Sequence, residues 1–362
     1  MDKRAVWGKR LPVLAQFMLL LTGVFLIKPT LSAAHSWDED DRLVLAFYYP
    51  WYRTMESSGY CTWNFGGFKY EDRDEQCEEN RNSPHLPAGG LYDSLDPDVI
   101  RRHLDESRRA GIDGWIVSWW GIEDHTDVLD LILDVASSHA PGFAVTIYYE
   151  RIPGCRGYVC TEASRKERIE GAIEDFQYLD SHYFCHPSYL KVSGRPVVFV
   201  YMRAMLQGMG VWPEIIERLQ SEMDLFLSAD AIITFAGSLV PGGFDQIHFY
   251  NQVYELLIFS PGLDYRGFVK SARLAKRGAA ITVLPGYDER LVPGRPGIHL
   301  ERKDGRTYRR VWDKAIAADP DWILVTSFNE WYETSEIEPS RELGDFYLEM
   351  TAEYSARFKG KK

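Results

Sequence analysis

Short apolar runs alternate with amphipathic segments along most of the chain. The runs are rich in β-branched and aromatic residues, which is typical of strands buried on both faces, and the segments between them repeat apolar residues at helical spacing. We expect strands at 43–52, 114–120, 143–150, 196–201, 231–235, 247–250 and 280–287, and an eighth that begins at 322. Helices are expected at 96–111, 126–139, from about 165, and at 212–223, 265–276, 308–317 and around 343–350.

Eight strand signals that alternate with helices predict a single (β/α)8 TIM barrel. The main rival is a doubly wound open sheet, which would usually show a glycine-rich first turn, whereas the first strand here ends in YYPWY at 48–52. Residues 53–95 form a long first βα loop, of the kind that often serves as a lid or binding loop. Glycines 237 and 243 bound a loop where a helix should follow the fifth strand, so we expect that helix to be reduced.

The first 34 residues have the layout of an export signal. Basic residues precede an apolar segment at 11–27, and Ser32 and Ala34 form a small-residue cleavage pair. We interpret 1–34 as a signal peptide or an N-terminal membrane anchor, 35–42 as an acidic linker and 43–362 as the (β/α)8 domain. The protein is therefore expected to be secreted or extracytoplasmic, or anchored facing the exported side, with 11–27 as the only possible membrane contact.

Charge narrows the class of partner. The formal net charge is −12, and without residues 1–34 the chain keeps 36 basic and 52 acidic residues, a net charge of −16. Such a protein repels nucleic acid and anionic membranes, so neutral or cationic partners are expected and no nucleic acid is. The same charge could also serve solubility alone.

Five cysteines fit an oxidising compartment. Cys61 and Cys77 bracket one loop and Cys155 and Cys160 lie in another, so the economical pairing leaves Cys185 over. Zinc binding is the alternative, but the chain has no Cys-x-x-Cys or paired-histidine spacing. No metal or other cofactor is predicted.

Aromatic and acidic residues recur where the predicted strands end, which is the edge of a barrel that carries chemistry. Aromatic rings cover the apolar faces of sugars, and carboxylates supply acid and base, so this recurrence predicts a carbohydrate cleft. The candidate substrate-binding residues are Tyr49, Trp51, Trp119, Trp120, Glu150, Tyr250, Tyr287, Asn329 and Trp331.

Glu330 and Glu333 are the candidate catalytic residues. On a continuing strand they would face opposite ways, so both can reach one substrate only if the chain turns after Asn329. Neighbours at that spacing on a turn have Cβ atoms ~5–6 Å apart, which favours a retaining over an inverting glycosidase. Glu336 and Glu338 precede a Pro-Ser pair and are expected to mark a helix N-terminus instead.

Four motifs together resemble glycoside hydrolase family 99. They are TSFNEWYETSEIEP at 326–339, YYPWY at 48–52, AGIDG followed by SWWG at 110–121, and PGYD at 285–288, and the similarity spans about residues 43–350. The resemblance implies a (β/α)8 barrel with endo-α-1,2-mannosidase or mannanase activity, which retains configuration without a covalent enzyme intermediate. It assigns Glu330 as the base that takes the proton of the substrate 2-hydroxyl, and Glu333 as the acid that protonates the departing sugar and later activates water.

The resemblance also places Glu150, Tyr49 and Tyr250 in the reactive subsite. The family's usual pattern has His and then Gly around the second acid, whereas this chain has Tyr332 and Thr334-Ser335, which changes shape and charge on the leaving-group side.

Two other function classes fit the same residues. One is a catalytically inactive glycan-binding barrel, which would bind an oligosaccharide or polysaccharide without turnover, and the other is a metal-dependent hydrolase.

Histidines and arginines near the strand ends have weaker assignments. His103 and His248 fall within a helix and a strand, so we expect structural roles for them. His85 and His299 lie in loops and could touch sugar hydroxyls. Arg203 and Arg290 are expected to hold the acids by ion pairs, and the pattern shows no phosphate loop or nucleotide fingerprint.

Overall fold

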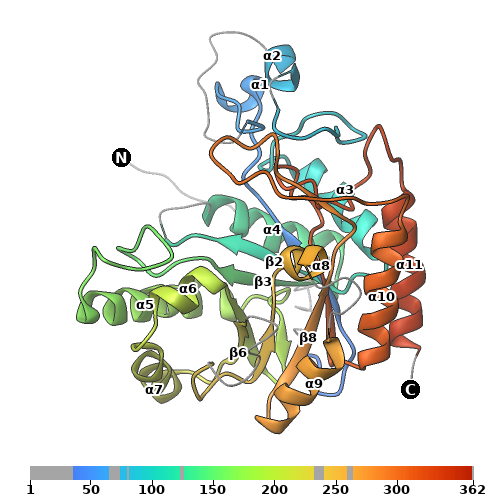
Figure 1. The fold of residues 1–362 in the computed structure, drawn as a ribbon. Helices are drawn as coiled ribbons and strands as arrows, with labels where there is room; N and C mark the ends of the chain where they lie inside the picture. The colour runs from blue at the N-terminus through green and yellow to red at the C-terminus, as the bar shows by residue number, and fades with distance from the viewer. Residues whose placement is uncertain are drawn as a thin grey trace, which may run out of the picture. The chain divides into compact units, whose positions relative to one another are not determined.

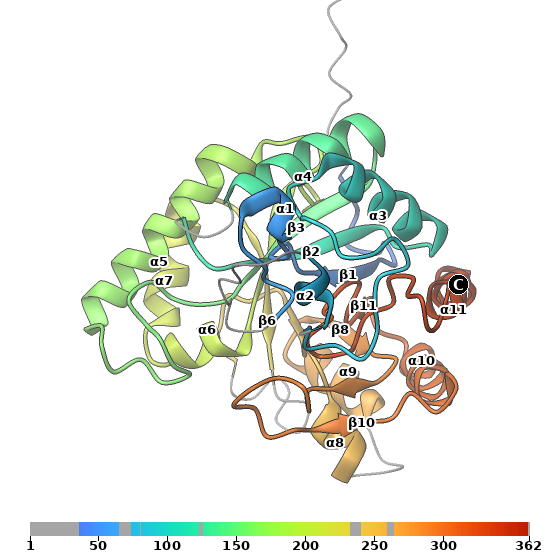
Figure 2. The same cartoon turned by 90° about the horizontal axis from the view of Figure 1, so that it is seen from above.

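Eight parallel strands close into a barrel at the centre of the fold (Figure 1, Figure 2). The computed structural model describes residues 36–64, 74–79, 81–122, 126–231, 240–258 and 264–360. The barrel strands are β1 (Val44–Tyr48), β2 (Gly114–Trp119), β3 (Ala144–Tyr149), β5 (Arg195–Val200), β6 (Phe226–Asp230), β7 (Gln246–His248), β8 (Gly278–Val283) and β11 (Trp322–Val325).

Strand pairing closes the sheet on itself. β1 pairs in parallel with β2 on one side and with β11 on the other, and β3 pairs with β5 where an open sheet would have an edge. The predicted (β/α)8 barrel is therefore confirmed. Among the described residues three short strands lie outside it: β4 (Lys191–Val192), antiparallel to β5, and the antiparallel pair β9 (Tyr287–Asp288) and β10 (His299–Leu300).

Helices surround the barrel, as the view from above shows (Figure 2). Side chains along β1 alternate between two apolar clusters: Leu45 and Phe47 belong to the interior, and Val44 and Ala46 to the layer between strands and helices. The helices are α1 (Met55–Ser58), α2 (Asp74–Glu79), α3 (Pro97–Arg109), α4 (Thr126–His139), α5 (Arg165–Leu179), α6 (Met202–Gln207), α7 (Trp212–Glu222), α8 (Val253–Ile258), α9 (Tyr265–Leu274), α10 (Arg306–Ala318) and α11 (Phe346–Lys359), with a π-helical turn at Asp180–Phe184.

The fifth strand begins earlier than the pattern predicts. The structure places it at Phe226–Asp230, and the expected segment 232–235 lies outside the described residues. The sequence pattern missed this strand because two of its interior positions are polar: Ser228 and Asp230 point into the barrel. There Ser228 donates to Gln246 and contacts His248, and Asp230 accepts from Tyr148. Of the segment expected to hold a reduced fifth helix, residues 240–245 are described and are not helical.

The first βα loop is long, as predicted, and carries α1 and α2 before α3 begins at Pro97. A disulfide joins Cys61 to Cys77, a second joins Cys155 to Cys160, and Cys185 is free. The expected cysteine pairing is therefore confirmed. Within the described part of the chain no helix has the length and apolarity needed to cross a bilayer, and the predicted signal or anchor lies outside that part.

Candidate active site

The chain turns sharply after β11, and this turn carries both candidate acids. The Glu330 amide donates to Ser327 Oγ over 2.7 Å, and the Ser335 amide donates back to the Glu330 carbonyl over 3.3 Å. The Ser327 amide donates to the Ser335 carbonyl over 2.8 Å, which closes the segment on itself. Glu330 and Glu333 thus lie on a tight turn, as their joint reach requires, and not on a continuing strand.

Asn329 connects the ends of β1 and β11. Its side-chain oxygen accepts from the Tyr49 amide over 2.8 Å, and its nitrogen donates to the Tyr49 carbonyl over 3.0 Å. The Tyr52 hydroxyl braces the same turn by donating to the Asn329 carbonyl and accepting from the Trp331 amide, each over 3.0 Å. Asn329 is fully buried. It positions its neighbours and does not line the cavity described next.

Three carboxylates converge on a small cavity of about 70 Å³ at the C-terminal ends of the strands. Glu150 follows β3, and Glu330 and Glu333 follow β11. Of the predicted site residues the structure brings these three together with four aromatic ones. The lining residues are Tyr49, Trp51, Trp120, Tyr148, Glu150, Tyr201, Arg203, Tyr250, Arg295, Glu330, Tyr332 and Glu333.

Glu333 is held by two donors. The Tyr250 hydroxyl donates to its Oε2 over 2.9 Å, and Arg295 Nη1 forms an ion pair with its Oε1 at 2.7 Å. Burial opposes the charge of Arg295, but Glu333 together with Tyr287 and Glu330 outweighs burial, and the pKa of Arg295 is raised overall. Arg295 also contacts Glu289 at 3.2 Å. This arginine keeps a fixed positive charge beside the pair.

Glu330 has a different environment. Its carboxyl is buried, and its Oε2 has no hydrogen-bond partner in the described protein. Burial raises the pKa of Glu330 well above its ordinary value, and the nearby Glu333 raises it further, while Arg295 lowers it. Glu330 is therefore a buried carboxyl with a raised pKa, beside a second carboxylate that is held in an ion pair by Arg295. Groups with such perturbed pKa values are candidates for acid–base catalysis.

Glu150 completes the group from the other side of the cavity. It accepts from Ser118 Oγ over 2.7 Å. Burial raises its pKa to about 8, although the Ser118 hydrogen bond and the charge of Arg203 work in the opposite direction. Arg203 lines the cavity with its guanidinium 4.8 Å from the Trp120 ring centre. Near neutral pH Glu150 is mostly protonated and can donate a hydrogen bond to a sugar oxygen.

Replacing Glu150 with glutamine should therefore change how stability depends on pH. Between its ordinary pKa of 4.5 and about 8, only the folded protein keeps this proton, so the free energy of unfolding falls as pH rises through that window. Glu150→Gln removes the contribution. The free energy of unfolding is measured with urea at pH 5 and at pH 8 for both proteins. The difference in this free energy, variant minus parent, should be about 2–4 kcal/mol larger at pH 8 than at pH 5. Glu353→Gln, at an exposed position, serves as the control. If the difference between Glu150→Gln and the parent were the same at both pH values, the raised pKa of Glu150 would be contradicted.

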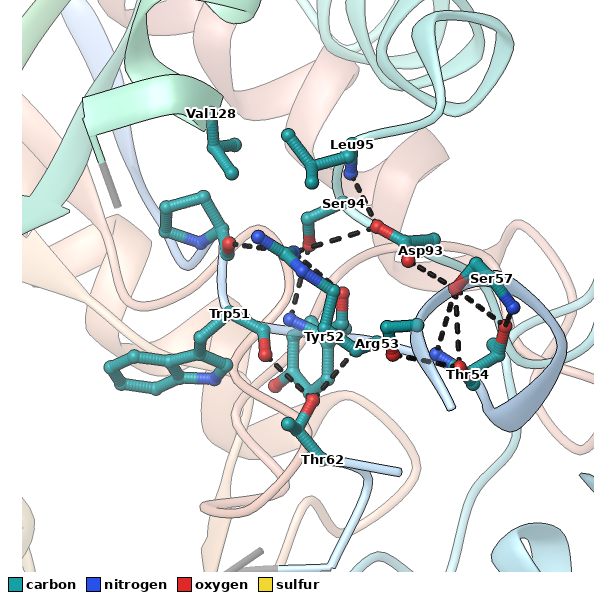
Figure 3. A network of polar contacts seen from close by, with 12 residues as sticks. Trp51, Tyr52, Arg53, Thr54, Ser57, Thr62, Asp93, Ser94, Leu95 and Val128 are labelled. Carbon is teal, nitrogen blue, oxygen red and sulfur yellow. Dashed lines mark hydrogen bonds and ion pairs between the residues drawn. The ribbon is translucent and has the colours of Figure 1, made fainter. Parts of the chain in front are cut away.

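Trp51 is positioned by the start of the first βα loop (Figure 3). The Thr62 hydroxyl donates to the Trp51 carbonyl and accepts from the Arg53 amide, both over 2.7 Å. Arg53 pairs with Asp93 at 3.5 Å, which ties the loop to the segment before α3. The Trp51 ring points away from this network in Figure 3 and stacks against Tyr332 at 6.0 Å. Hydrogen bonds to the backbone around Trp51 thus hold its ring in place against Tyr332.

A wider groove of about 620 Å³ opens beside the cavity and shares part of its wall. Tyr201, Arg203, Tyr250, Arg295 and Glu333 line both hollows, whereas Glu330 lines only the cavity. The predicted site residue Tyr287 lies in this groove and donates to Glu289 over 2.8 Å. The remaining groove residues lie at the end of β6, after β5, β6, β7 and β8, and on the loop that follows β3.

Two predicted aromatic residues lie in the core. Trp119 is buried and stacks against Tyr149 at 5.8 Å, and it does not line the cavity. Trp331 is fully buried and donates from Nε1 to Glu338 over 3.0 Å. Trp119 thus packs behind the strand end, and Trp331 packs beneath the turn whose neighbouring acids point into the cavity.

The prediction that Glu336 and Glu338 mark a helix N-terminus is wrong, because the next helix begins at Phe346. Glu336 is buried and pairs with His85 and with Arg302, each at 2.8 Å. These two side chains reach Glu336 from segments remote in sequence. His85, expected near the sugar, instead holds this part of the turn.

His103 has the structural role expected of it. It is buried, with Nδ1 3.0 Å from the Tyr48 hydroxyl and Nε2 3.0 Å from Glu338. Glu338 also accepts from the Tyr92 hydroxyl over 2.9 Å. This network ties α3 to the segment after β11 and supports the turn from below.

His248 also lies in the core, with Nδ1 2.9 Å from Ser228 Oγ. Burial lowers its pKa to about 3. Arg290, expected to pair with the acids, instead pairs with Asp288, and His299 lies 3.8 Å from the same carboxylate. Across the described residues no group of three or more histidine, cysteine or acidic side chains is arranged to hold a metal ion.

Comparison with known proteins connects this geometry to a family. The model of glycosyl hydrolase family 99 matches residues 39–359, nearly the whole barrel. The chain belongs to glycosyl hydrolase family 99. The protein is therefore a glycoside hydrolase, and the resemblance inferred from the four motifs is confirmed.

Relatives of this family 99 chain are distant in sequence. Glycoprotein endo-alpha-1,2-mannosidase from Mus musculus is 24% identical over 360 residues, covering 86% of this chain and 74% of the mouse protein. The enzyme of that name from Rattus norvegicus is 25% identical over 342 residues, covering 84% and 70%. The solved GH99 endo-alpha-mannosidase from Bacteroides thetaiotaomicron, in complex with BIS-TRIS-Propane, superposes with a TM-score of 0.71 at 22% identity, covering 90% of this chain and 98% of that one.

In this family 99 member Tyr332, the residue at which the sequence resemblance implies a histidine, lies in the cavity wall. The Tyr332 hydroxyl donates to the Thr62 carbonyl, and its ring stacks on Trp51. The tyrosine thereby connects the turn after β11 to the first βα loop. Arg295, which pairs with Glu333 in the cavity, is a candidate site residue that the sequence pattern missed. Its only local signal is the segment PGRPG at 293–297, which indicates a loop and no more.

Proposed function

We propose that the protein is a retaining, endo-acting glycoside hydrolase that cleaves α-mannosidic linkages through participation of the substrate 2-hydroxyl. The observation that carries this is the placement of Glu330 and Glu333 on one turn, facing one cavity, with aromatic rings around them. The names of the mouse and rat relatives support the choice of mannose.

The reaction has two displacement steps. Glu330 takes the proton of the 2-hydroxyl while that oxygen attacks the anomeric carbon, the glycosidic bond breaks and Glu333 protonates the departing sugar oxygen. Water then attacks the anomeric carbon of the resulting 1,2-anhydro sugar. Glu333 accepts the proton of this water, the bond from the 2-oxygen to the anomeric carbon breaks and Glu330 returns its proton to the 2-oxygen. Two inversions give net retention.

Stereochemistry favours α-mannose in this scheme. The 2-oxygen of an α-mannoside lies on the opposite face of the ring from the leaving group, so it can attack the anomeric carbon from behind. In an α-glucoside the two oxygens lie on the same face, and this attack is blocked. A base beside the 2-hydroxyl and an acid beside the glycosidic oxygen are close neighbours on one sugar, which fits two acids three residues apart.

The substrate must help Glu330 to ionise. Burial raises the pKa of Glu330 well above its ordinary value, and the nearby Glu333 raises it further, so the free site favours the acid form of Glu330. The mechanism needs its carboxylate. A substrate 2-hydroxyl that donates to Glu330 Oε2, which has no hydrogen-bond partner among the described residues, stabilises that carboxylate.

Product analysis tests the proposal. The protein is incubated with a panel of α-linked manno-oligosaccharides and α-glucosylated mannosides, and NMR follows the anomer released first. We expect oligosaccharide products from internal cleavage, with the α anomer appearing before mutarotation. An initial β anomer, or release of single sugars only, would overturn it. Binding without any turnover would point to the glycan-binding barrel instead.

We also propose that the protein acts after export from the cytoplasm, as a secreted enzyme or one anchored through residues 11–27. The basic, apolar and small-residue order of residues 1–34 supports this. The two disulfides support it independently, because such bonds persist in oxidising compartments. Cell fractionation followed by N-terminal sequencing of the mature protein distinguishes the two forms, and a cytosolic full-length product would refute both.

A further inference from the structure

The loop after β3 carries an exposed tyrosine beside the groove. Tyr158 lies between Cys155 and Cys160, and 49% of its surface is accessible. It lines the 620 Å³ groove that adjoins the catalytic cavity. An exposed aromatic ring in a carbohydrate groove, outside the reacting site, is suited to stack on the apolar face of a sugar.

Several contacts fix this ring in place although it is exposed. The disulfide closes the loop, and buried Gln207 donates to the Gly157 carbonyl over 2.6 Å. The Tyr158 hydroxyl lies 3.2 Å from the Tyr201 hydroxyl, and the Arg203 guanidinium lies over the Tyr158 ring at 5.2 Å. A ring that is already oriented loses little conformational freedom when a sugar packs on it, which favours binding.

The walls of the groove place it on one side of the scissile bond. Of the two catalytic acids only Glu333 lines it, and Glu333 is the acid assigned to the departing sugar. A chain that extends from the leaving oxygen therefore enters this groove, which runs over the ends of β5, β6 and β7. Tyr254, on α8, is a second exposed tyrosine of the same groove.

We propose that Tyr158 is a specificity-determining residue that stacks on a sugar of the leaving-group chain and makes the enzyme prefer long substrates. This rests on the proposed function, because the groove is assigned through the role of Glu333. The ligand class is a neutral oligosaccharide segment of α-linked hexoses. The reacting sugar itself does not touch Tyr158.

The test compares mannoside donors that share one non-reducing portion but carry fluoride, or one, two or three mannose units, as leaving group. The quantity measured is the ratio of kcat/KM for the longest leaving group to that for fluoride. In Tyr158→Ala this ratio should fall about tenfold, the effect of losing one aromatic stacking partner. In Tyr158→Phe it should stay within about twofold of the parent, because the ring remains.

Val159→Ala is the matched control. Val159 is 72% exposed on the same loop and does not line the groove, so the ratio should not change. A Tyr158→Ala ratio equal to the parent's, or one reduced equally by Val159→Ala, would overturn the proposal. If the parent turns over none of the donors, both the proposed function and this inference are wrong. If the parent is active but Tyr158→Ala leaves the ratio unchanged, only this inference is wrong.

The disulfide gives a second measurement. Replacing Cys155 and Cys160 with serine opens the loop but keeps Tyr158, so the same ratio should fall by about threefold through lost preorganisation. Adding Tyr158→Ala to this variant should then lower the ratio to that of Tyr158→Ala alone. If the combined variant instead showed the product of the two separate reductions in the ratio, the loop would act through some residue other than Tyr158.

Discussion

Glu330→Gln is expected to lower kcat on α-linked manno-oligosaccharides by at least ~10³-fold, because the amide cannot take the proton of the 2-hydroxyl. Glu333→Gln should cost a similar factor on the same substrates, since the departing sugar then leaves without a proton. The substitutions are nearly isosteric. Both acids are buried on a turn closed by backbone hydrogen bonds, so unfolding by urea should show a folded protein in each case.

Leaving-group chemistry separates the two roles. A glycosyl fluoride departs without protonation, so Glu333→Gln should release fluoride at close to the parent rate in the first turnover. Added azide, which needs no general base, should then restore steady turnover and give an α-glycosyl azide. Glu330→Gln should show neither effect. Recovery of Glu330→Gln in place of Glu333→Gln would reverse the assignment, and full activity in either variant would remove that residue from the mechanism.

Arg295→Met is expected to reduce kcat/KM by about 10²-fold and to move the acidic limb of its pH profile to higher pH. Arg295 pairs with Glu333 at 2.7 Å, and its charge lowers the pKa of Glu330. Without that charge the pKa of Glu330 rises further. Because Glu330 must be ionised to act as base, a higher pH is then needed for activity.

Arg290→Met provides the matched control. Arg290 belongs to the same loop, but its ion pair is with Asp288 and its side chain is mostly exposed. Its loss should leave the pH profile where it is in the parent. If Arg295→Met lowered kcat/KM equally at every pH, the arginine would be a substrate contact or a structural support and not a determinant of the charge on the pair.

The periodic pattern of the chain determined the barrel well because strands buried on both faces are continuous apolar runs. It failed at Phe226–Asp230, where Ser228 and Asp230 find hydrogen-bond partners inside the barrel. Polar interior residues look like loop in a sequence. Only the neighbouring strands, which supply Gln246 and Tyr148, make such a strand stable.

The candidate site divides in the same way. Glu330, Glu333, Glu150 and the aromatic strand ends could be found from the sequence because they follow strand signals directly, and all parallel strand ends of a barrel meet at one edge. Tertiary structure alone decided which aromatic residues face the cavity, since Trp119 and Trp120 are adjacent in sequence but point to different layers.

The sequence by itself thus determined the family, the barrel and the position of the two candidate acids, because these depend on local pattern and on a short motif. The charge environment of the acids was decided by Arg295, 38 residues before Glu333 and on another loop. Electrostatic interaction depends on distance in space and on burial, and no local pattern records either. The folded chain had to bring that loop across the strand ends before the ion pair of Glu333 and the effect of Arg295 on the pKa of Glu330 could be inferred.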